Sequence, residues 1–407
     1  MPDVSVLEVR LHGEVIGTLT HIGSERTLFA FTENYITSAQ RPTLGLNFKD
    51  VYGELRTDFR AYRTQLMPFF SNLLPEGPLR KYLVEMAGVH PQREFFLLWA
   101  LGQDLAGAIT VTPAQGDAWP QEAATAPGSK AAKTLAHEAL RFSLAGVQLK
   151  FSAIKAAGRG LTIPVDGVGG NWIVKLPSRE FAHVPENEFS MMTLAKSVGI
   201  AVPAIDLIDV GAIGNPPAGM EKLGGKAFLI ERFDRDAQGN PIHTEDFAQV
   251  FGVYPEDKYK NASLATLARV VAIECGQGDA AEFIRRVTFN VLIGNGDMHL
   301  KNWSLMYPDR RHARLAPAYD FISTIGYPVD DEFALKFSRT REWSGYTRDE
   351  LEHLAARAQL PAKFVLDTAR ETSELFREQW GKEKTHLPLD KSLVRAIDRH
   401  LQRVPQF

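Results

Sequence analysis

The chain has 407 residues, of which 44% are hydrophobic and 23% charged, proportions typical of a folded protein with a sizeable core. Its net charge of −3 excludes a surface built as a whole to bind nucleic acid, so any basic patch is local. The single cysteine, Cys275, excludes an intramolecular disulfide and indicates a reducing compartment. No apolar run reaches the roughly 18 residues of a membrane span, and the amino terminus lacks the pattern of a secretory signal. We therefore expect a cytoplasmic protein with no membrane partner.

The amino-terminal part of the chain predicts a β-rich unit. Residues 4–35 alternate between apolar and polar in short bursts, which favours consecutive β-strands. Amphipathic helices are expected at residues 79–87 and 94–101, and a closing strand at 106–112. Residues 113–133 are rich in Ala, Pro, Gly and Gln and lack apolar periodicity, which is typical of an exposed linker.

The rest of the chain predicts a small β-rich lobe followed by a larger helical lobe. The expected elements of the small lobe are strands at residues 142–154, 171–176 and 227–233, a glycine-rich hairpin loop at 158–170 and a helix at 185–198. From His243 onward we expect helices almost throughout, except at residues 292–323.

One loop in the helical half carries the strongest chemical pattern. Asp297 and Asn302 stand five positions apart, the D-x-x-x-x-N spacing of a kinase catalytic loop. In such a loop the Asp receives the proton of the substrate hydroxyl and the Asn binds magnesium. Asp320 follows eighteen positions later and offers a second hard oxygen ligand for magnesium. The spacing alone fits residues that cap turns equally well, so its weight depends on the segments before it.

Those upstream segments occur in the order that a kinase needs. Residues 143–150 read Ser-Leu-Ala-Gly-Val-Gln-Leu-Lys, in which the Ala-Gly pair lets backbone N–H groups approach phosphates. Lys175 ends a strand similar to the one whose lysine contacts the α- and β-phosphates in kinases. Glu188 in the following helix is its expected partner, because a buried lysine needs an anion. Taken singly, Lys175 fits a solvent-facing strand end and Glu188 a surface residue.

An apolar strand that breaks into polar residues at 228–235 fits the hinge between two lobes. The backbone at Glu231, Arg232 and Phe233 is expected to hydrogen-bond the adenine edge, although a salt-bridged strand end has the same pattern. The joint order of phosphate loop, lysine, glutamate, hinge and acidic loop is more specific than any single part. It predicts an α+β, two-lobed, protein-kinase-like fold with a β-rich amino-terminal subdomain and a mostly helical carboxy-terminal lobe. The expected cofactors are ATP and Mg²⁺.

These segments resemble the HipA family of serine/threonine kinase toxins. The resemblance rests on Ser-x-Ala-Gly-x-Gln-x-Lys at residues 143–150, Pro-Glu-Asn-Glu-Phe at 185–189, Glu-Arg-Phe-Asp-Arg at 231–235, Asp-x-His-x-Lys-Asn at 297–302 and Phe-Phe-Ser-Asn-Leu-Leu-Pro-Glu-Gly at 69–77. It covers nearly the whole chain. Leu149 departs from the family pattern, because the residue before the loop lysine is often acidic in relatives.

The resemblance implies a toxin that is neutralised by a small DNA-binding antitoxin, through which it mainly reaches operator DNA. In the best-known relatives the protein substrate is glutamyl-tRNA synthetase. These relatives also phosphorylate the serine of the phosphate loop, here Ser143, and the added charge of roughly −1.5 to −2 would repel nucleotide. A silent scaffold that binds antitoxin and DNA, or a kinase of small molecules or lipids, remain alternatives on the same fold.

The implied site has Asp297 as the catalytic residue, Asn302 and Asp320 as magnesium ligands, and Lys175 oriented by Glu188. Residues assigned to nucleotide binding are Ala145, Gly146, Val147, Gln148, Lys150, Lys175, Glu231, Arg232, Phe233, His299, Lys301 and Tyr319. His299 is expected to face the phosphates or a metal-bound water, although a lone loop histidine is usually structural. Residues 257–260 fit the acceptor side of the cleft or, more simply, a solvated turn, and stay outside the predicted site.

The predicted domains are an amino-terminal subdomain (1–112), a linker (113–138), a small lobe with phosphate loop and hinge (139–236) and a helical lobe with the catalytic and metal-binding loops (237–407). Near the end of the chain, basic residues recur every four positions beside an apolar stripe: Lys391, Arg395, Arg399 and Arg403. A helix packed on the lobe is the expected interpretation, ahead of one that touches the DNA backbone.

Overall fold

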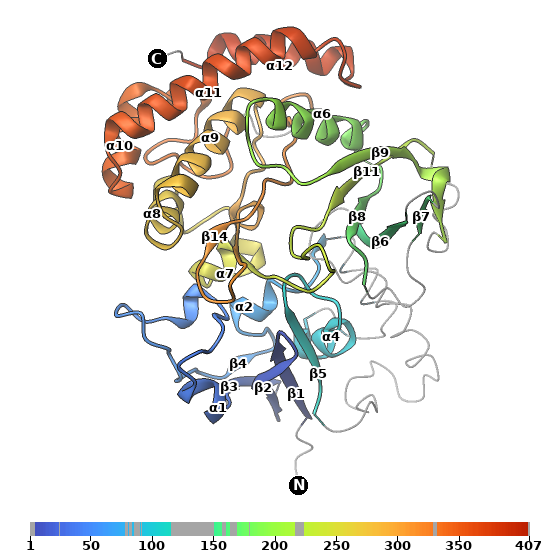
Figure 1. Cartoon of the computed structure of the whole chain (residues 1–407), viewed down its shortest axis with the longest axis vertical. Coiled ribbons are helices and arrows are strands. Elements are labelled where there is room, and N and C mark those ends of the chain that lie inside the picture. Colours follow the sequence, from blue (N-terminus) through green and yellow to red (C-terminus); the bar gives the residue numbers. More distant parts are fainter. Residues whose placement is uncertain are drawn as a thin grey trace.

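The computed structural model describes residues 5–23, 25–77, 80, 84, 90, 92–114, 150–156, 160–162, 169–178, 180–215, 224–328 and 332–405. A β-rich subdomain lies at one end of the molecule, a second sheet beside its middle, and helices at the other end (Figure 1). This is the predicted α+β arrangement. The predicted phosphate loop with Ser143, Ala145, Gly146, Val147 and Gln148, most of the helix expected at 79–87 and most of the linker fall outside the described residues.

The amino-terminal subdomain is built on a five-stranded sheet of order β4-β3-β2-β1-β5, in which all neighbours are antiparallel. Its elements are β1 (Ser5–Leu11), β2 (Glu14–Ile22), β3 (Arg26–Phe31), α1 (Glu33–Thr37), η1 (Leu46–Phe48), β4 (Tyr62–Arg63), α2 (Pro68–Ser71), α4 (Glu94–Leu101) and β5 (Ile109–Pro113). Leu7, Val9 and Leu11 alternate along β1 and bury one face of the sheet.

Helix α4 occupies the predicted residues, but the expectation that it is amphipathic is wrong. All of its residues except Trp99 are buried. The helix packs on β5, and Glu94 at its start binds the segment that contains Leu66 and Ser71. Its carboxylate accepts hydrogen bonds from the Leu66 N–H (2.9 Å) and the Ser71 hydroxyl (3.0 Å) and pairs with Arg80. The one charged side chain at the start of this apolar helix is therefore fully paired.

The small lobe contains a six-stranded sheet of order β10-β7-β6-β8-β11-β9. Its elements are β6 (Lys150–Ala156), β7 (Gly160–Thr162), β8 (Trp172–Lys175), α6 (Val184–Ser197), β9 (Ile205–Asp209), η4 (Val210–Ala212), β10 (Ile213–Gly214) and β11 (Lys226–Glu231). Residues 160–162 pair with β6, so the loop expected at 158–170 contains a short strand.

Two different cores cover the two faces of this sheet. Val174 and Leu229 belong to the core of the amino-terminal subdomain, whereas their neighbours Ile173 and Phe228 face the core of α6 and the helical lobe. Successive strand residues point to opposite faces, so both faces of the sheet are covered. The subdomain and the small lobe consequently share one hydrophobic core.

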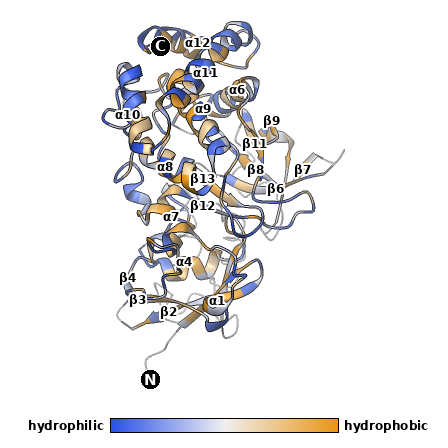
Figure 2. Cartoon of the chain, turned by 60° about the vertical axis from the view of Figure 1, so that its left-hand side comes forward, coloured by the Kyte–Doolittle hydropathy of each residue, from blue (hydrophilic) through white to orange (hydrophobic). Residues whose placement is uncertain are grey.

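The helical lobe surrounds a three-stranded sheet of order β12-β13-β14. Its elements are β12 (His243–Asp246), α7 (Phe247–Phe251), η5 (Pro255–Asp257), α8 (Leu264–Glu274), α9 (Gln277–Ile293), η6 (Leu300–Asn302), β13 (Ser304–Tyr307), β14 (Arg314–Leu315), η7 (Trp343–Gly345), α10 (Arg348–Ala358), α11 (Ala362–Glu383) and α12 (Lys391–Arg403). In Figure 2 hydrophobic residues run through the central helix α9, and polar residues gather on the outer helix α10.

Two expectations for this lobe need correction. The first residues from His243 onward are not helical, because His243–Asp246 forms strand β12 and pairs with β13. The described residues 324–328 and 332–347 also contain no α-helix. The terminal helix α12 behaves as predicted, since Leu393, Ile397 and Leu401 are buried while its basic residues are exposed. Among the described helices none has the length and apolar character needed to cross a membrane.

A buried charge cluster joins the subdomain to the hinge. The guanidinium of Arg232, whose side chain is fully buried, pairs with Asp104 of the subdomain (3.2 Å) and with Asp234 (2.8 Å). The N–H of Gly107 donates to Asp234 (2.8 Å), and Arg235 donates to the Gly107 carbonyl (3.1 Å). Asp104 of the subdomain therefore neutralises positive charge of the hinge residues Arg232 and Arg235.

Replacing Arg232 tests how much this cluster stabilises the fold. Arg232→Met leaves two buried carboxylates with only Arg235 as a cation, and breaking a buried pair typically costs about 3–5 kcal/mol. The free energy of unfolding, measured by chemical denaturation, should fall by that amount. Arg348→Met, which removes the exposed pair with Glu352, is the control and should change little. Equal effects of the two substitutions would contradict a stabilising role for the cluster.

Candidate active site

A cavity of about 830 Å³ lies where the three regions of the molecule meet. Its lining includes Glu76 from the subdomain, Lys175 from the small lobe, and Asp297, Asn302 and Asp320 from the helical lobe. Residues as far apart in the sequence as Glu76 and Asp320 thus line one shared cavity. A cavity of this size is in the range that holds a small ligand or cofactor.

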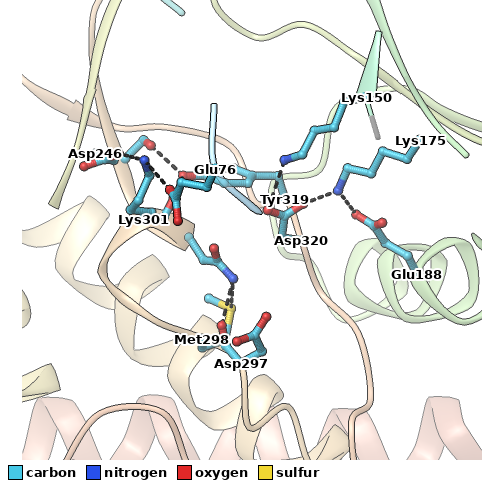
Figure 3. Close-up of polar contacts among 12 residues, drawn as sticks. Glu76, Lys150, Lys175, Glu188, Asp246, Asp297, Met298, Lys301, Tyr319 and Asp320 are labelled. Carbon is cyan, nitrogen blue, oxygen red and sulfur yellow. Dashed lines mark hydrogen bonds and ion pairs between the residues drawn. The ribbon is translucent and has the colours of Figure 1, made fainter. Parts of the chain in front are cut away.

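Lys175 is the centre of a buried ion-pair network in this cavity (Figure 3). It stands at the end of β8, and its ammonium group contacts Glu188 of α6 and Asp320 of the loop after β14. The Lys150 ammonium lies 3.8 Å from the other Asp320 oxygen. The lysine thus has the glutamate partner that the sequence predicted, and Asp320 as a second one. Sequence reasoning did not find that Lys150 also faces Asp320.

Burial and charge act in opposite directions on these groups. Burial favours the neutral form of Lys175, but Asp320 and Glu188 outweigh it and raise the lysine pKa. Burial likewise favours protonated Asp320, but Lys150 and Lys175 hold the pKa of that carboxyl well below its usual range. Asp320 is therefore ionised at neutral pH and carries the charge that a cation ligand requires.

The loop that carries Asp297 is fixed at its start by a glycine. Helix α9 ends at Gly294, which has φ +65° and donates to the Asn290 carbonyl in a left-handed cap. A Cβ there would lie 2.6 Å from a methyl group of Ile325, so only glycine fits without a shift. Asn295 then donates to the Asn290 side chain (2.8 Å). The chain thereby leaves the helix in one defined direction.

The same loop is closed at its far end by Asn302. The Asn302 side-chain nitrogen donates to the Asp297 carbonyl (2.9 Å), so the amide oxygen is the atom of this side chain that could coordinate a cation. Asp320 has φ +56°, a left-handed conformation that is uncommon outside glycine and that aspartate tolerates better than most residues. One carboxylate and one amide oxygen are hard donors of the kind that Mg²⁺ prefers, together with phosphate oxygens. Both residues therefore fit a magnesium ion chemically.

Asp297 receives a hydrogen bond that the sequence did not predict. The Tyr259 hydroxyl donates to Asp297 Oδ1 (2.6 Å), and the Tyr259 ring packs edge-on against His299 (5.1 Å between centroids). Removal from water raises the pKa of Asp297, while the Tyr259 bond and Lys258 oppose that rise. Lys258 and Tyr259 both line the cavity, which agrees with the alternative that residues 257–260 lie at the cleft, whereas Lys260 is exposed as in a solvated turn.

Two of the three hinge residues already donate their backbone N–H to another part of the chain, and the third has its N–H available for a ligand. The Glu231 N–H donates to the Ala204 carbonyl and the Arg232 N–H to the Asn171 carbonyl, both at 2.8 Å. Within the described part of the chain nothing accepts from the Phe233 N–H. Arg232 lines the cavity, but its N–H is taken and its guanidinium points into the subdomain cluster, so its predicted contact with nucleotide stays a prediction.

An aromatic pair connects the hinge to the loop that carries Asp320. Phe233 stacks on Tyr319 with ring centroids 5.6 Å apart and planes inclined by 28°. The Tyr319 hydroxyl donates to the Lys301 carbonyl (2.9 Å) and shares a hydrogen bond with Ser304 (2.6 Å). Both rings line the cavity, where they offer an apolar wall beside the available hinge N–H.

His299 and Lys301 also line the cavity. The histidine is neutral, whereas the lysine is ion-paired. His299 is buried, and burial together with Lys258 lowers its pKa to about 3, so the ring is neutral. Its Nδ1 has no hydrogen-bond partner among the described residues. The Lys301 ammonium lies 2.6 Å from a Glu76 oxygen and donates to the Asn72 carbonyl (3.0 Å). Lys301 therefore lines the cavity while the subdomain holds its ammonium group in place.

Sequence reasoning missed three residues that contact this site: Glu76, Lys258 and Tyr259. Glu76 lies within the segment 69–77 that carries the family resemblance, but its sequence neighbours do not reveal an ionic partner. Lys258 and Tyr259 belong to a charged tetrapeptide of the type common on surfaces. That Lys258 is buried and that Tyr259 contacts Asp297 is visible only once the chain is folded.

Two lobes, a paired strand lysine and an Asp–Asn loop beside a second aspartate define a protein of the kinase class. The HipA-like C-terminal domain matches residues 142–380 and the HipA N-terminal domain matches residues 7–112. The chain therefore belongs to the HipA family, as the sequence predicted.

Individual relatives agree with this assignment. The Sinorhizobium fredii protein named "Putative kinase Y4dM" is 54% identical over 410 residues, which span 100% of this chain and 99% of that protein. The "Serine/threonine-protein kinase toxin HipA" of Shewanella oneidensis is 27% identical over 376 residues, 80% of this chain and 79% of that protein. A solved structure of Shewanella oneidensis HipA with HipB and operator DNA has a TM-score of 0.72 at 23% identity, and covers 98% of this chain and 96% of that chain. This likeness confirms the predicted fold.

The Tyr259 hydroxyl should set the acidity of Asp297. A hydrogen bond donated to a carboxylate stabilises its charged form, so Tyr259→Phe should raise the Asp297 pKa further above its usual value. Carbon-13 NMR of the labelled aspartate carboxyls, titrated from acid to neutral pH, measures that shift. Tyr52→Phe, which alters an exposed tyrosine, is the control. An Asp297 pKa that stays unchanged or falls would contradict the assignment of this bond.

Proposed function

We propose that this protein transfers the γ-phosphoryl group of ATP, with Mg²⁺, to a serine or threonine hydroxyl of another protein, and that it acts as the toxin of a toxin–antitoxin pair. One observation carries the proposal: Lys175, Asp297, Asn302 and Asp320 all line one cavity at the meeting of two lobes. Family membership supports the same reaction class.

Each of these side chains has a distinct role in the proposed reaction. Lys175, oriented by Glu188, binds the α- and β-phosphates, whose oxygens compete with Asp320 for its ammonium group. Asp297 orients the acceptor hydroxyl and accepts its proton. Asn302 and Asp320 hold magnesium, which when bound neutralises charge on the phosphates. Positioning and preorganised charge supply most of the rate, because phosphoryl transfer requires little covalent chemistry from the protein.

The nucleotide is proposed to lie between the hinge and this charged end. The Phe233 N–H is the available donor for an adenine edge, and the rings of Phe233 and Tyr319 form its apolar wall. Lys150 and His299 face the phosphate end of the cavity. The loop with Ser143, Ala145, Gly146, Val147 and Gln148 is proposed to cover the phosphates, on the family pattern.

Partners are proposed from the relatives. The Shewanella oneidensis structure contains HipA with HipB and operator DNA, so a small DNA-binding antitoxin is the proposed partner here, with operator DNA reached mainly through it. The proposed protein substrate is a translation component such as glutamyl-tRNA synthetase. The domain boundaries 1–112, 113–138, 139–236 and 237–407 belong to the same proposal. The family matches at 7–112 and 142–380 support the separation of the first domain from the rest.

Removing either acidic group tests the reaction directly. Asp297→Ala and Asp320→Ala should each lower ATP-dependent protein phosphorylation by about 10³-fold or more, because one loses the proton acceptor and the other a metal ligand. Transfer of labelled phosphate from ATP with Mg²⁺ measures the rate, and circular dichroism checks the fold. Asp209→Ala removes an exposed aspartate of the small lobe and should leave the rate unchanged. Activity like wild type in either site variant would overturn the proposed function.

Self-phosphorylation provides a second test. After incubation with ATP and Mg²⁺, mass spectrometry should find phosphate on Ser143, and the modified protein should bind ATP more weakly because the added negative charge repels the phosphates. Ser143→Ala should not acquire this phosphate, and Asp297→Ala should not produce it. An active kinase without any modified Ser143 would refute this part of the proposal, whereas a protein that phosphorylates nothing would favour the scaffold alternative.

A further inference from the structure

Two lysines and a glutamate form a second buried charge group in the cavity, which we call the Glu76 cluster. Glu76 Oε1 lies 2.6 Å from the Lys301 ammonium and Glu76 Oε2 lies 3.0 Å from the Lys258 ammonium. The exposed fraction of the side chain is only 13% for Glu76, 7% for Lys301 and 10% for Lys258. Figure 3 shows Glu76 and Lys301 on the other side of Asp320 from Lys175 and Glu188.

Both lysines of the cluster are connected to the catalytic loop. Lys301 directly precedes Asn302, the proposed metal ligand. The Lys258 carbonyl accepts a hydrogen bond from the Leu300 N–H (3.1 Å), and the next residue, Tyr259, donates to Asp297. The backbone of the two lysines is therefore linked to both ends of the Asp297–Asn302 segment.

Glu76 belongs to a segment of the amino-terminal subdomain that is hydrogen-bonded to the helical lobe. The Asn72 side chain donates to the Val253 carbonyl (2.7 Å), and the Asn72 carbonyl accepts from Lys301. Gln249 of α7 donates to the Phe69 carbonyl (3.0 Å). The segment that leads to Glu76 is thus attached to the helical lobe at several points, so the carboxylate is preorganised before any ligand enters.

Glu76 compensates one of the two positive charges of the cluster. Burial alone would raise the pKa of Glu76, but Lys301 and Lys258 lower it to about 2, so it is ionised. The next carboxyl, Asp246, lies 4.0 Å from Lys301, and burial raises its pKa to about 6. Without Glu76 the two ammonium groups would repel each other and attract any anion in the cavity more strongly.

From this arrangement we infer that Glu76 is a positioning residue for phosphoryl transfer, which holds the ammonium groups of Lys258 and Lys301 beside Asp297 and Asn302. The inference rests on the proposed function, since its substrate is the γ-phosphoryl group of ATP. The two lysines then face that group in a fixed geometry while Glu76 limits their attraction for the ground-state triphosphate. The amino-terminal subdomain thereby contributes a side chain to the site.

Glu76→Gln keeps the size of the side chain and removes its charge, which makes it the appropriate test in the full-length protein. Calorimetry with Mg²⁺ should show that a non-hydrolysable ATP analogue binds about tenfold more tightly relative to ADP than in the wild type, because uncompensated lysines favour the γ-phosphate. The kcat for phosphorylation should fall about tenfold, while KM for ATP does not rise. A purely structural residue would not change the preference between triphosphate and diphosphate.

The matched control is Glu256→Gln, which removes a carboxylate at the same boundary between subdomain and helical lobe. Glu256 accepts from the Gln65 side chain (2.8 Å) at an exposed position and does not line the cavity. This variant should leave nucleotide preference and kcat as in the wild type.

A double-mutant cycle shows whether Glu76 acts through the lysines. In a Lys258→Met, Lys301→Met background, Glu76→Gln should cause no further change in the triphosphate preference. A Glu76→Gln protein that is folded and has an unchanged preference and kcat overturns the inference, and so does a full additive effect in the background without lysines. If the wild type binds no nucleotide, the proposed function itself fails; if it binds and transfers phosphate normally, a negative result refutes only the role of Glu76.

Discussion

The contact of one buried ammonium group with two carboxylates holds the candidate site together. Lys175 comes from a strand of the small lobe, Glu188 from the helix that covers it, and Asp320 from a loop of the helical lobe. A lone buried cation of this kind costs several kcal/mol, so the strand, the helix and the loop must stay in register for the lysine to remain charged. Charge compensation thus fixes the separation of the lobes at the point where phosphates would bind.

The amino-terminal subdomain is part of the same construction. It shares a hydrophobic core with the small-lobe sheet, neutralises Arg232 at the hinge through Asp104, and places Glu76 between two lysines of the helical lobe. Each of these contacts satisfies a buried polar or apolar group that belongs to another region. The cavity is consequently defined by three regions of the chain, although kinase chemistry alone requires only two lobes.

The sequence predicted the parts of the site whose residue type and order are set by chemistry. Lys175, Glu188, Asp297, Asn302 and Asp320 were predicted because a kinase needs them in that order, and all five line one cavity. The direction in which a side chain points, and its partner far away in the sequence, could not be predicted. Nothing local shows that the guanidinium at position 232 turns away from the hinge toward an aspartate 128 residues earlier. The tetrapeptide at 257–260 has the polarity of a surface turn, and α4 is apolar on all sides because other segments enclose it, a property of the fold rather than of its own pattern.

The cluster at the hinge has a consequence for how chains of this kind can diverge. Arg232, Arg235 and Asp234 sit in one family-matched segment and Asp104 in the other, so neither segment is electrically neutral at their shared boundary without its counterpart. Recombination that joined the amino-terminal half of one homologue to the carboxy-terminal half of another would have to transmit these positions as a set. Their covariation across a lineage would then record that the two halves were inherited together.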